Sequence, residues 1–259
     1  MLEVYGTEHI VYMCVCLVLM VVLLMLLKRF VPRDKMFIPV KLTAAVGLVL
    51  IVINRIVVAR SRGGTFLDFI LDTYCSMMGF ILPVVVLLFR PGTKIFQYAI
   101  FAGMIGGLIT FFYPDFLVYF DSIFNIHPFT GLLYHTLMVL VFLEALVCGY
   151  YTPSFRKWAS FPVGLAFMVV FAVFGNTVLG QSNNMYLNAP LLPDTALTWW
   201  VAGILMLVLY TVCLQVYEMV RLPVREWSAA KAAQSLRAAL VRKKNKEKEP
   251  LRRDEEKNT

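Results

Sequence analysis

The stretch FLDFILDTYCSMMGFILPVVVLLF, residues 66–89, decides how the rest of the chain is interpreted. It is long and apolar enough to cross a bilayer as one helix. Helical spacing would place Asp68, Asp72 and Cys75 on one face, followed by Gly79 and Pro83. Because ionisable groups inside a membrane are energetically costly, they usually face a protein interior or a wet cavity. We therefore expect residues 66–89 to form one wall of such a cavity.

The composition indicates an integral membrane protein built from helices. Of the 259 residues, 60% are hydrophobic and 15% are charged, whereas soluble domains carry about 25% charged residues. Each apolar segment is near the roughly 20 residues that a helix needs to span the hydrocarbon. We predict an all-α, polytopic bundle of about seven transmembrane helices, near residues 10–27, 41–59, 66–89, 95–113, 128–150, 161–180 and 198–220.

The distribution of Lys and Arg between the spans predicts an orientation. Basic residues follow the first, third and fifth spans, and a basic tail follows the seventh. Since short cytoplasmic loops are enriched in Lys and Arg, we expect the N-terminus outside and the C-terminus in the cytoplasm, with the plasma membrane as the location. The loop residues concerned are Lys28, Arg29, Arg33, Lys35, Arg90, Lys94, Arg156 and Lys157.

Most of the positive charge lies at the end of the chain. The formal net charge is +8, and residues 221–259 hold 12 Lys/Arg against 6 Asp/Glu. A charge gathered in one tail does not indicate nucleic-acid binding. We expect residues 1–222 to form the transmembrane domain and residues 223–259 a basic cytoplasmic tail. In that tail, residues 225–241 have the pattern of an interfacial helix, and the whole tail could contact anionic lipid of the inner leaflet.

Three arginines, Arg55, Arg60 and Arg62, lie on the expected outer side, against the charge bias. In one interpretation they reach from the helix end to the lipid headgroups, as long basic side chains commonly do. In the other they form a rim, together with Asn54, that binds phosphate or another anion, since guanidinium matches phosphate geometry. Both interpretations stay open. In either, we expect their replacement to leave folding nearly intact, because surface charges contribute little to stability.

Further polar residues converge on the same half of the bundle. At 1.5 Å per residue, Cys75 would lie about 14 Å and His135 about 10–12 Å below the outer surface. Asn176 would lie about one turn below the outer end of the sixth span, and the loop GQSNNMYLNAPLLPDTA, residues 180–196, follows that span. A lone buried cysteine usually has a packing role, but the pair at one depth is a candidate site. The asymmetry favours a pocket open to the outer leaflet over a through-channel.

Several other site classes find no support in the sequence. The five cysteines lie in apolar runs, which is not typical of a disulfide framework. There is no metal-ligand spacing, phosphate loop or dinucleotide motif, so we expect no metal and no cofactor. The small residues Gly103, Gly106 and Gly107 indicate close packing of the fourth helix.

Four short motifs, taken in order, resemble the YwaF-type integral membrane family. They are DTYCSMMGFILP, TFFYPD, NIHPFTGLLYHTL and GNTVLGQSNNMYLNAP, and the resemblance covers roughly residues 50–220. Eukaryotic relatives of that family include acyltransferases that remodel ether phospholipids. The resemblance implies that Cys75 carries a fatty-acyl group as the nucleophile and that His135 is its base. Asn176, Asn183 and Tyr186 match the last motif.

The chemistry of these residues is compatible with acyl transfer. A thiolate needs a base or a positive field at neutral pH, which His135 could supply. Asp72 beside the sulfur would disfavour the thiolate, so it suits orienting His135 or pairing with Arg55. Asn176, or the amides of residues 183 and 184, could polarise an ester carbonyl.

We therefore predict a lipid acyltransferase or acyl hydrolase that acts on membrane phospholipid from the outer leaflet. Two alternatives remain open. One is a small transporter or scramblase-like protein in which Asp68 and Asp72 bind protons or cations. The other is a non-catalytic, lipid-binding partner subunit. Transport predicts a polar path that continues to the cytoplasmic side, whereas catalysis predicts a dead-end pocket with Cys75 near its floor.

Overall fold

The computed structural model describes residues 2–181, 183–190, 195–196 and 198–221, with 223, 231, 234–235 and 238–239. These residues form helices and turns and no strand, which confirms the all-α prediction. Within these described residues, six helices are long and apolar enough to cross a membrane, and α3 is shorter. The seven helices are α1 (Thr7–Phe30), α2 (Phe37–Arg62), α3 (Tyr74–Leu88), α4 (Lys94–Phe112), α5 (Ile126–Val147), α6 (Ser160–Thr177) and α7 (Trp199–Arg221).

The contacts divide the chain into two units, residues 1–152 with 156–207, and residues 153–155 with 208–259. Helices α1 to α6 and α7 up to residue 207 belong to the first unit. The predicted tail, residues 223–259, falls almost wholly outside the described residues. Its interfacial helix and its contact with anionic lipid therefore stay predictions, as does the orientation of the termini.

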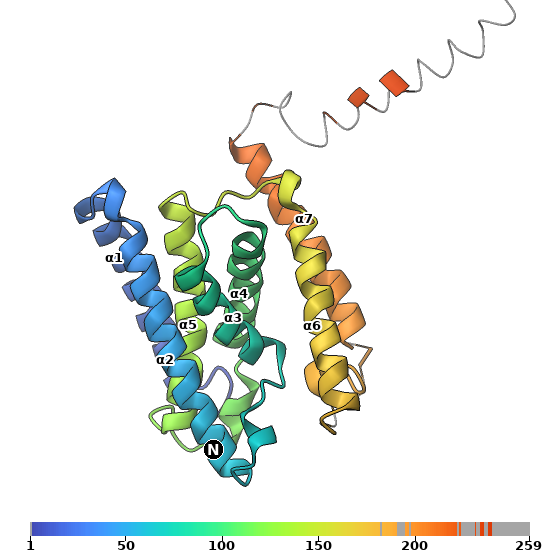
Figure 1. Cartoon of the computed structure of the whole chain (residues 1–259). Helices are drawn as coiled ribbons and strands as arrows, with labels where there is room; N and C mark the ends of the chain where they lie inside the picture. The colour runs from blue at the N-terminus through green and yellow to red at the C-terminus, as the bar shows by residue number, and fades with distance from the viewer. Residues whose placement is uncertain are drawn as a thin grey trace, which may run out of the picture. The chain divides into compact units, whose positions relative to one another are not determined.

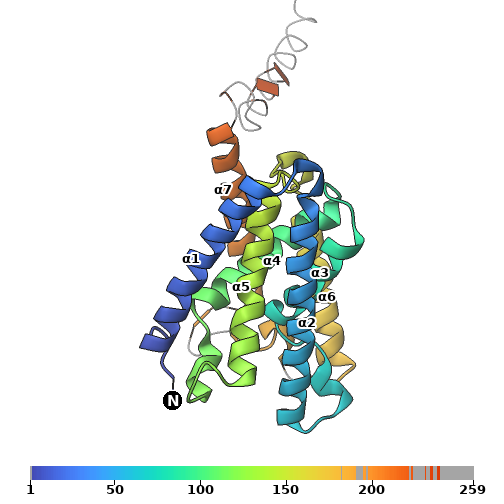
Figure 2. The same ribbon diagram turned by 90° about the vertical axis from the view of Figure 1, so that its left-hand side faces the viewer.

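Helices α4 and α5 form the centre of the first unit. They run side by side (Figure 1), α3 packs on α4, and α2 packs on both α3 and α5. Turned by 90°, α5 lies between α1 and α2 (Figure 2). Helix α4 is buried along nearly its whole length, and Phe101 meets Phe161 of α6 edge to face at 5.3 Å. Burial on all sides explains why its sequence shows no polar face.

Small residues bring α4 close to its neighbours, as predicted. A Cβ added at Gly107 would stand 2.7 Å from the backbone carbonyl oxygen of His135, and one at Gly103 would meet the side chain of Leu82. Real Cβ atoms do not approach a backbone oxygen so closely. The absence of a side chain at Gly107 therefore sets how near α4 lies to the segment that carries His135.

The third span differs from the prediction, because α3 begins only at Tyr74. Thr73 caps it, accepting a hydrogen bond from the backbone N–H of Ser76. Before it, Phe66–Phe69 form a separate 3₁₀ turn in which Thr65 and Asp68 hydrogen-bond reciprocally. A capping box fixes where a helix begins, because it satisfies the free N–H groups of the first turn.

The expected helical face that joins Asp68, Asp72 and Cys75 therefore does not exist. The two aspartates lie in the segment that leads into α3, and Cys75 is the second residue of the helix rather than about 14 Å along it. That placement puts Cys75 at the end of the bundle where α2 and α4 finish and where α5 begins.

Candidate active site

A cavity of about 450 Å³ lies at this end of the bundle. Its size is typical of small-molecule sites, which range from about 300 to 1,000 Å³. The walls come from the end of α2, residues 72–76, the end of α4, the start of α5, residues 185–186 and the first turns of α7. Of the residues named from the sequence, those that line the cavity are Asn54, Arg55, Arg62, Asp72, Cys75, His135 and Tyr186. Whether this end of the bundle faces outward stays a prediction.

Cys75 lines the cavity and is partly buried. Its sulfur lies 3.6 Å from the carbonyl oxygen of Gly106, which accepts from the thiol, and 3.5 Å from the hydroxyl of Thr110, which donates to it. Both partners belong to α4. All five cysteines are free thiols. The sulfur is therefore held in place by hydrogen bonds to α4, in a residue that lines the cavity.

His135 lines the same cavity from α5 and is only 3% exposed. Its Nδ1 lies 2.7 Å from the carbonyl oxygen of Gly131, one turn earlier. A carbonyl can only accept, so Nδ1 carries the proton and, in the neutral ring, Nε2 keeps a free lone pair. Among the described residues nothing hydrogen-bonds to this Nε2. No hydrogen bond joins it to Cys75, although both side chains line one space.

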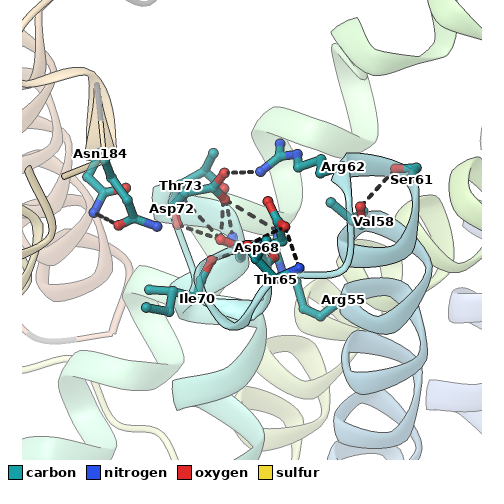
Figure 3. A network of polar contacts seen from close by, with 12 residues as sticks. Arg55, Val58, Ser61, Arg62, Thr65, Asp68, Ile70, Asp72, Thr73 and Asn184 are labelled. Carbon is teal, nitrogen blue, oxygen red and sulfur yellow. Dashed lines mark hydrogen bonds and ion pairs between the residues drawn. The ribbon is translucent and has the colours of Figure 1, made fainter. Parts of the chain in front are cut away.

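Asp72 pairs with arginine and does not orient His135. Its two carboxylate oxygens accept from Arg62 at 2.7 Å and from Arg55 at 3.4 Å (Figure 3). Of the two expected roles, pairing with Arg55 is therefore the one present. The carbonyl of Gly131 takes the orienting role instead.

The three arginines have different environments. Arg55 is buried and also donates to the backbone carbonyls of Asp68 and Ile70, at 3.0 and 2.9 Å (Figure 3). Arg62 is half exposed and lines the cavity, whereas Arg60 is exposed and does not line it. The expectation that all three are surface charges is wrong for Arg55. The segment after α2 folds back over this side chain, which bonds to its backbone carbonyls.

Asn54 lines the cavity, where its amide donates to the carbonyl of His127 and the hydroxyl of Thr130, both at 3.0 Å. Asn176 and Asn183 do not line it. Asn176 accepts from the backbone N–H of residue 184 at 2.7 Å, and the Asn183 side chain holds its own loop. Their expected role in polarising a substrate carbonyl therefore has no geometric support, since the side-chain oxygens of both residues accept hydrogen bonds from backbone N–H groups of the loop.

Tyr186 does reach the cavity, because its loop is fastened to the segment before α3. The backbone N–H of Met185 donates to the carbonyl of Asp72 at 2.9 Å, and Met185 is fully buried. Both Met185 and Tyr186 have positive φ, at 51° and 57°, a conformation that is uncommon for such side chains. Burial raises the pKa of Tyr186 and nearby Asp115 raises it further, so its hydroxyl stays protonated and able to donate.

Sequence reasoning missed several residues of the cavity. Thr110 contacts the sulfur, and the ring of Trp199 packs against that of Tyr74, tilted by 39° with the centroids 5.6 Å apart. Trp199, Ala202 and Met206 follow one another at helical spacing and give the cavity an apolar wall. A threonine near the end of an apolar span was the available signal for Thr110. No sequence signal marked the apolar wall from α7, since apolar helix faces are common in a membrane protein.

Comparison with known protein families gives a match over most of the chain. The model of the TMEM164 family matches residues 4–217, which covers all of the cavity-lining residues. Comparison with curated proteins and with solved structures gives no match.

Proposed function

The chain belongs to the TMEM164 family of membrane proteins, and we propose that it transfers fatty-acyl groups between membrane lipids through Cys75 and His135. One observation carries the proposal. Cys75, a free thiol, and His135, whose Nε2 has no hydrogen-bond partner among the described residues, both line one amphipathic cavity. A nucleophile and a base within one site are the elements of covalent acyl transfer.

The proposed reaction uses these two groups in sequence. The thiol proton of Cys75 moves to Nε2 of His135, and the thiolate attacks the ester carbonyl carbon of a phospholipid. As the tetrahedral intermediate collapses, the lysolipid oxygen leaves and takes the proton from the imidazolium. An acceptor hydroxyl then gives its proton to Nε2 and attacks the thioester, and the released thiolate regains that proton. Water in place of the acceptor would give hydrolysis.

The two ends of the cavity suit the two parts of a phospholipid. Arg62 is half exposed at the polar end, where a phosphate could share its guanidinium with Asp72. The wall formed by Trp199, Ala202 and Met206 suits an acyl chain. We propose that the cavity opens to the outer leaflet of the plasma membrane, following the charge distribution of the loops.

The surroundings of the acidic residues support acyl transfer over ion transport. Asp68 accepts two hydrogen bonds from Thr65, and Asp72 is paired with two arginines, so neither carboxylate lacks compensation. Beyond the cavity, toward the other end of the bundle, the carboxylate of Glu144 bonds to Thr43 next to a space of only about 10 Å³. A continuous polar path is not supported by this arrangement.

The experiment that tests the proposal is mass spectrometry of the intact, purified protein. We expect an acyl adduct on Cys75 that hydroxylamine removes, since hydroxylamine cleaves thioesters. Cys75→Ala should abolish the adduct, and His135→Ala should slow its formation by about 10² to 10⁴-fold, the usual contribution of a general base. Cys148→Ala is the control, because that thiol contacts the carbonyl of Met36 at the other end of the bundle. An adduct that survives in Cys75→Ala would contradict the proposal, and the lipid-binding alternative would then be favoured.

A further inference from the structure

The sulfur of Cys75 lies between two groups of α4, one that accepts a hydrogen bond from the thiol and one that donates to it. The carbonyl of Gly106 can only accept, so at 3.6 Å it accepts a hydrogen bond from the thiol. The hydroxyl of Thr110, one turn further along α4, lies 3.5 Å from the sulfur and donates to it. The first contact favours the neutral thiol, and the second is compatible with either form.

Loss of the thiol proton changes the balance between these two contacts. A thiolate has nothing to donate to the Gly106 carbonyl, and the negative end of that dipole then faces an anion. The Thr110 hydroxyl keeps its own proton, and a hydrogen bond to an ionised acceptor is roughly twice as strong as a neutral one. Among the described residues, Thr110 is the side chain that donates to this sulfur.

The position of Thr110 is fixed by the packing of α4. Thr110 is buried, at 7% exposure, and it lines the cavity with Cys75. A Cβ at Gly106 would already lie 3.3 Å from Met138 and 3.4 Å from Tyr74, so α4 cannot turn or shift freely here. The donor is therefore preorganised for the sulfur, and no side chain has to be reordered when the charge forms.

We propose that Thr110 is a third group of the site, whose hydroxyl stabilises the Cys75 thiolate. For acyl transfer this rests on the proposed function, because the thiolate is the nucleophile there. Formation of the thiolate itself can be followed without any acyl transfer. The thiol proton goes to Nε2 of His135 or to solvent in the cavity, and the Thr110 hydroxyl contributes a hydrogen bond and no proton.

Alkylation of the full-length protein in detergent tests this inference. Iodoacetamide reacts with thiolates, so the rate at Cys75, followed by peptide mass spectrometry between pH 6 and 10, reports the thiolate fraction. Thr110→Val has nearly the same shape without the hydroxyl. We expect about tenfold slower alkylation at every pH in this range at which the rate still rises with pH, the effect of one charge-assisted hydrogen bond. Thr110→Ser should restore the rate to within about twofold.

Two controls separate this effect from general damage. Thr43→Val also removes one side-chain hydrogen bond, to Glu144, and should leave Cys75 unchanged. The rate at Cys148 in the same sample reports unfolding, which would expose both thiols and raise both rates. If Thr110→Val disturbs the fold in this way, Thr110→Ala serves as the second variant and the ratio of the two rates is compared.

The results distinguish the two proposals. Unchanged alkylation of Cys75 in the folded Thr110→Val protein, or failure of Thr110→Ser to restore it, would overturn the role of Thr110. Slowed alkylation in a protein that never forms an acyl adduct would support that role and contradict acyl transfer. Slowed alkylation together with a slowed adduct supports both.

Discussion

Arg62 donates a hydrogen bond of 2.7 Å to Asp72, and this pair fastens the segment before α3 to the end of α2 (Figure 3). Arg55 reaches the other oxygen of the same carboxylate and, at the same time, two backbone carbonyls of that segment. Arginines that oppose the charge bias of the loops thus have partners within the protein. Arg62 also lines the cavity and is half exposed, so the proposed phosphate would share its guanidinium with Asp72.

Arg55 and Arg60 should differ in their effect on stability. Arg55→Gln would leave the carbonyls of Asp68 and Ile70 without their donor and should lower the free energy of unfolding by about 1–3 kcal/mol. Arg60→Gln should change it by less than about 0.5 kcal/mol, because that side chain is exposed. Thermal unfolding of the purified variants measures both, and equal stability of the two would contradict the buried role of Arg55.

The turn at Phe66–Phe69 should open in acid. The hydroxyl and N–H of Thr65 donate to Asp68, and these hydrogen bonds lower the pKa of Asp68 below its ordinary value of 3.8. A lowered pKa in the folded protein means that the carboxylate stabilises the turn above about pH 3.8 and that this contribution is lost as pH falls through the lowered value. Pepsin, which works in acid, should therefore cleave near Phe66 increasingly as pH decreases.

Asp68→Asn is the matched variant for that experiment. The Asn side chain has no charge to lose. Cleavage of this variant near residue 66 should therefore follow only the pH dependence of pepsin itself. The ratio of wild-type to variant cleavage is the quantity to compare between pH 2 and 4.5. A ratio that does not change with pH would show that the Asp68 carboxylate does not hold the turn.

Gly107→Ala should displace the segment that carries His135. The new Cβ would stand 2.7 Å from the His135 carbonyl oxygen and 2.9 Å from Val139, and crowding of this kind typically lowers stability by about 1–3 kcal/mol. Gly203→Ala is the control, since nothing lies within 4 Å of a Cβ there and alanine is the better helix former. Unfolding temperatures of both variants check the prediction, and a Gly107→Ala protein as stable as Gly203→Ala would exclude close packing at this position.

The helices could be predicted from the sequence more readily than the site. Apolar runs of about 20 residues locate six spans well, because a membrane requires that length. The third span was predicted too long, since Thr65 and Thr73 start separate turns through hydrogen bonds that hydropathy does not register. Cys75 and His135 line one cavity, as the sequence predicts. The predicted depth of Cys75, about 14 Å along its helix, is wrong, because α3 begins only at Tyr74. Thr110 was missed because its partner is 35 residues away in sequence.

The orientation of the bundle can be tested by labelling introduced cysteines. Asn125 is exposed just before α5, at the end of the bundle that holds the cavity, and its side chain makes no capping hydrogen bond. Lys94 is exposed at the first residue of α4, at the opposite end. Both can therefore be replaced with little effect on the fold. A membrane-impermeant maleimide applied to intact cells should label Asn125→Cys, and should label Lys94→Cys only after permeabilisation.

The charges of the loops at the two ends of the bundle are the reason for the expected labelling pattern. Lys94 belongs to one of the basic loops, which are retained in the cytoplasm, whereas the loop before Asn125 carries Asp115 and Asp121. The unmodified protein gives the background from Cys14, which is exposed on α1. Labelling of Lys94→Cys in intact cells, with Asn125→Cys protected, would reverse the orientation. The cavity would then open to the cytoplasmic leaflet, and the phospholipid that reaches Arg62 would have to come from that side.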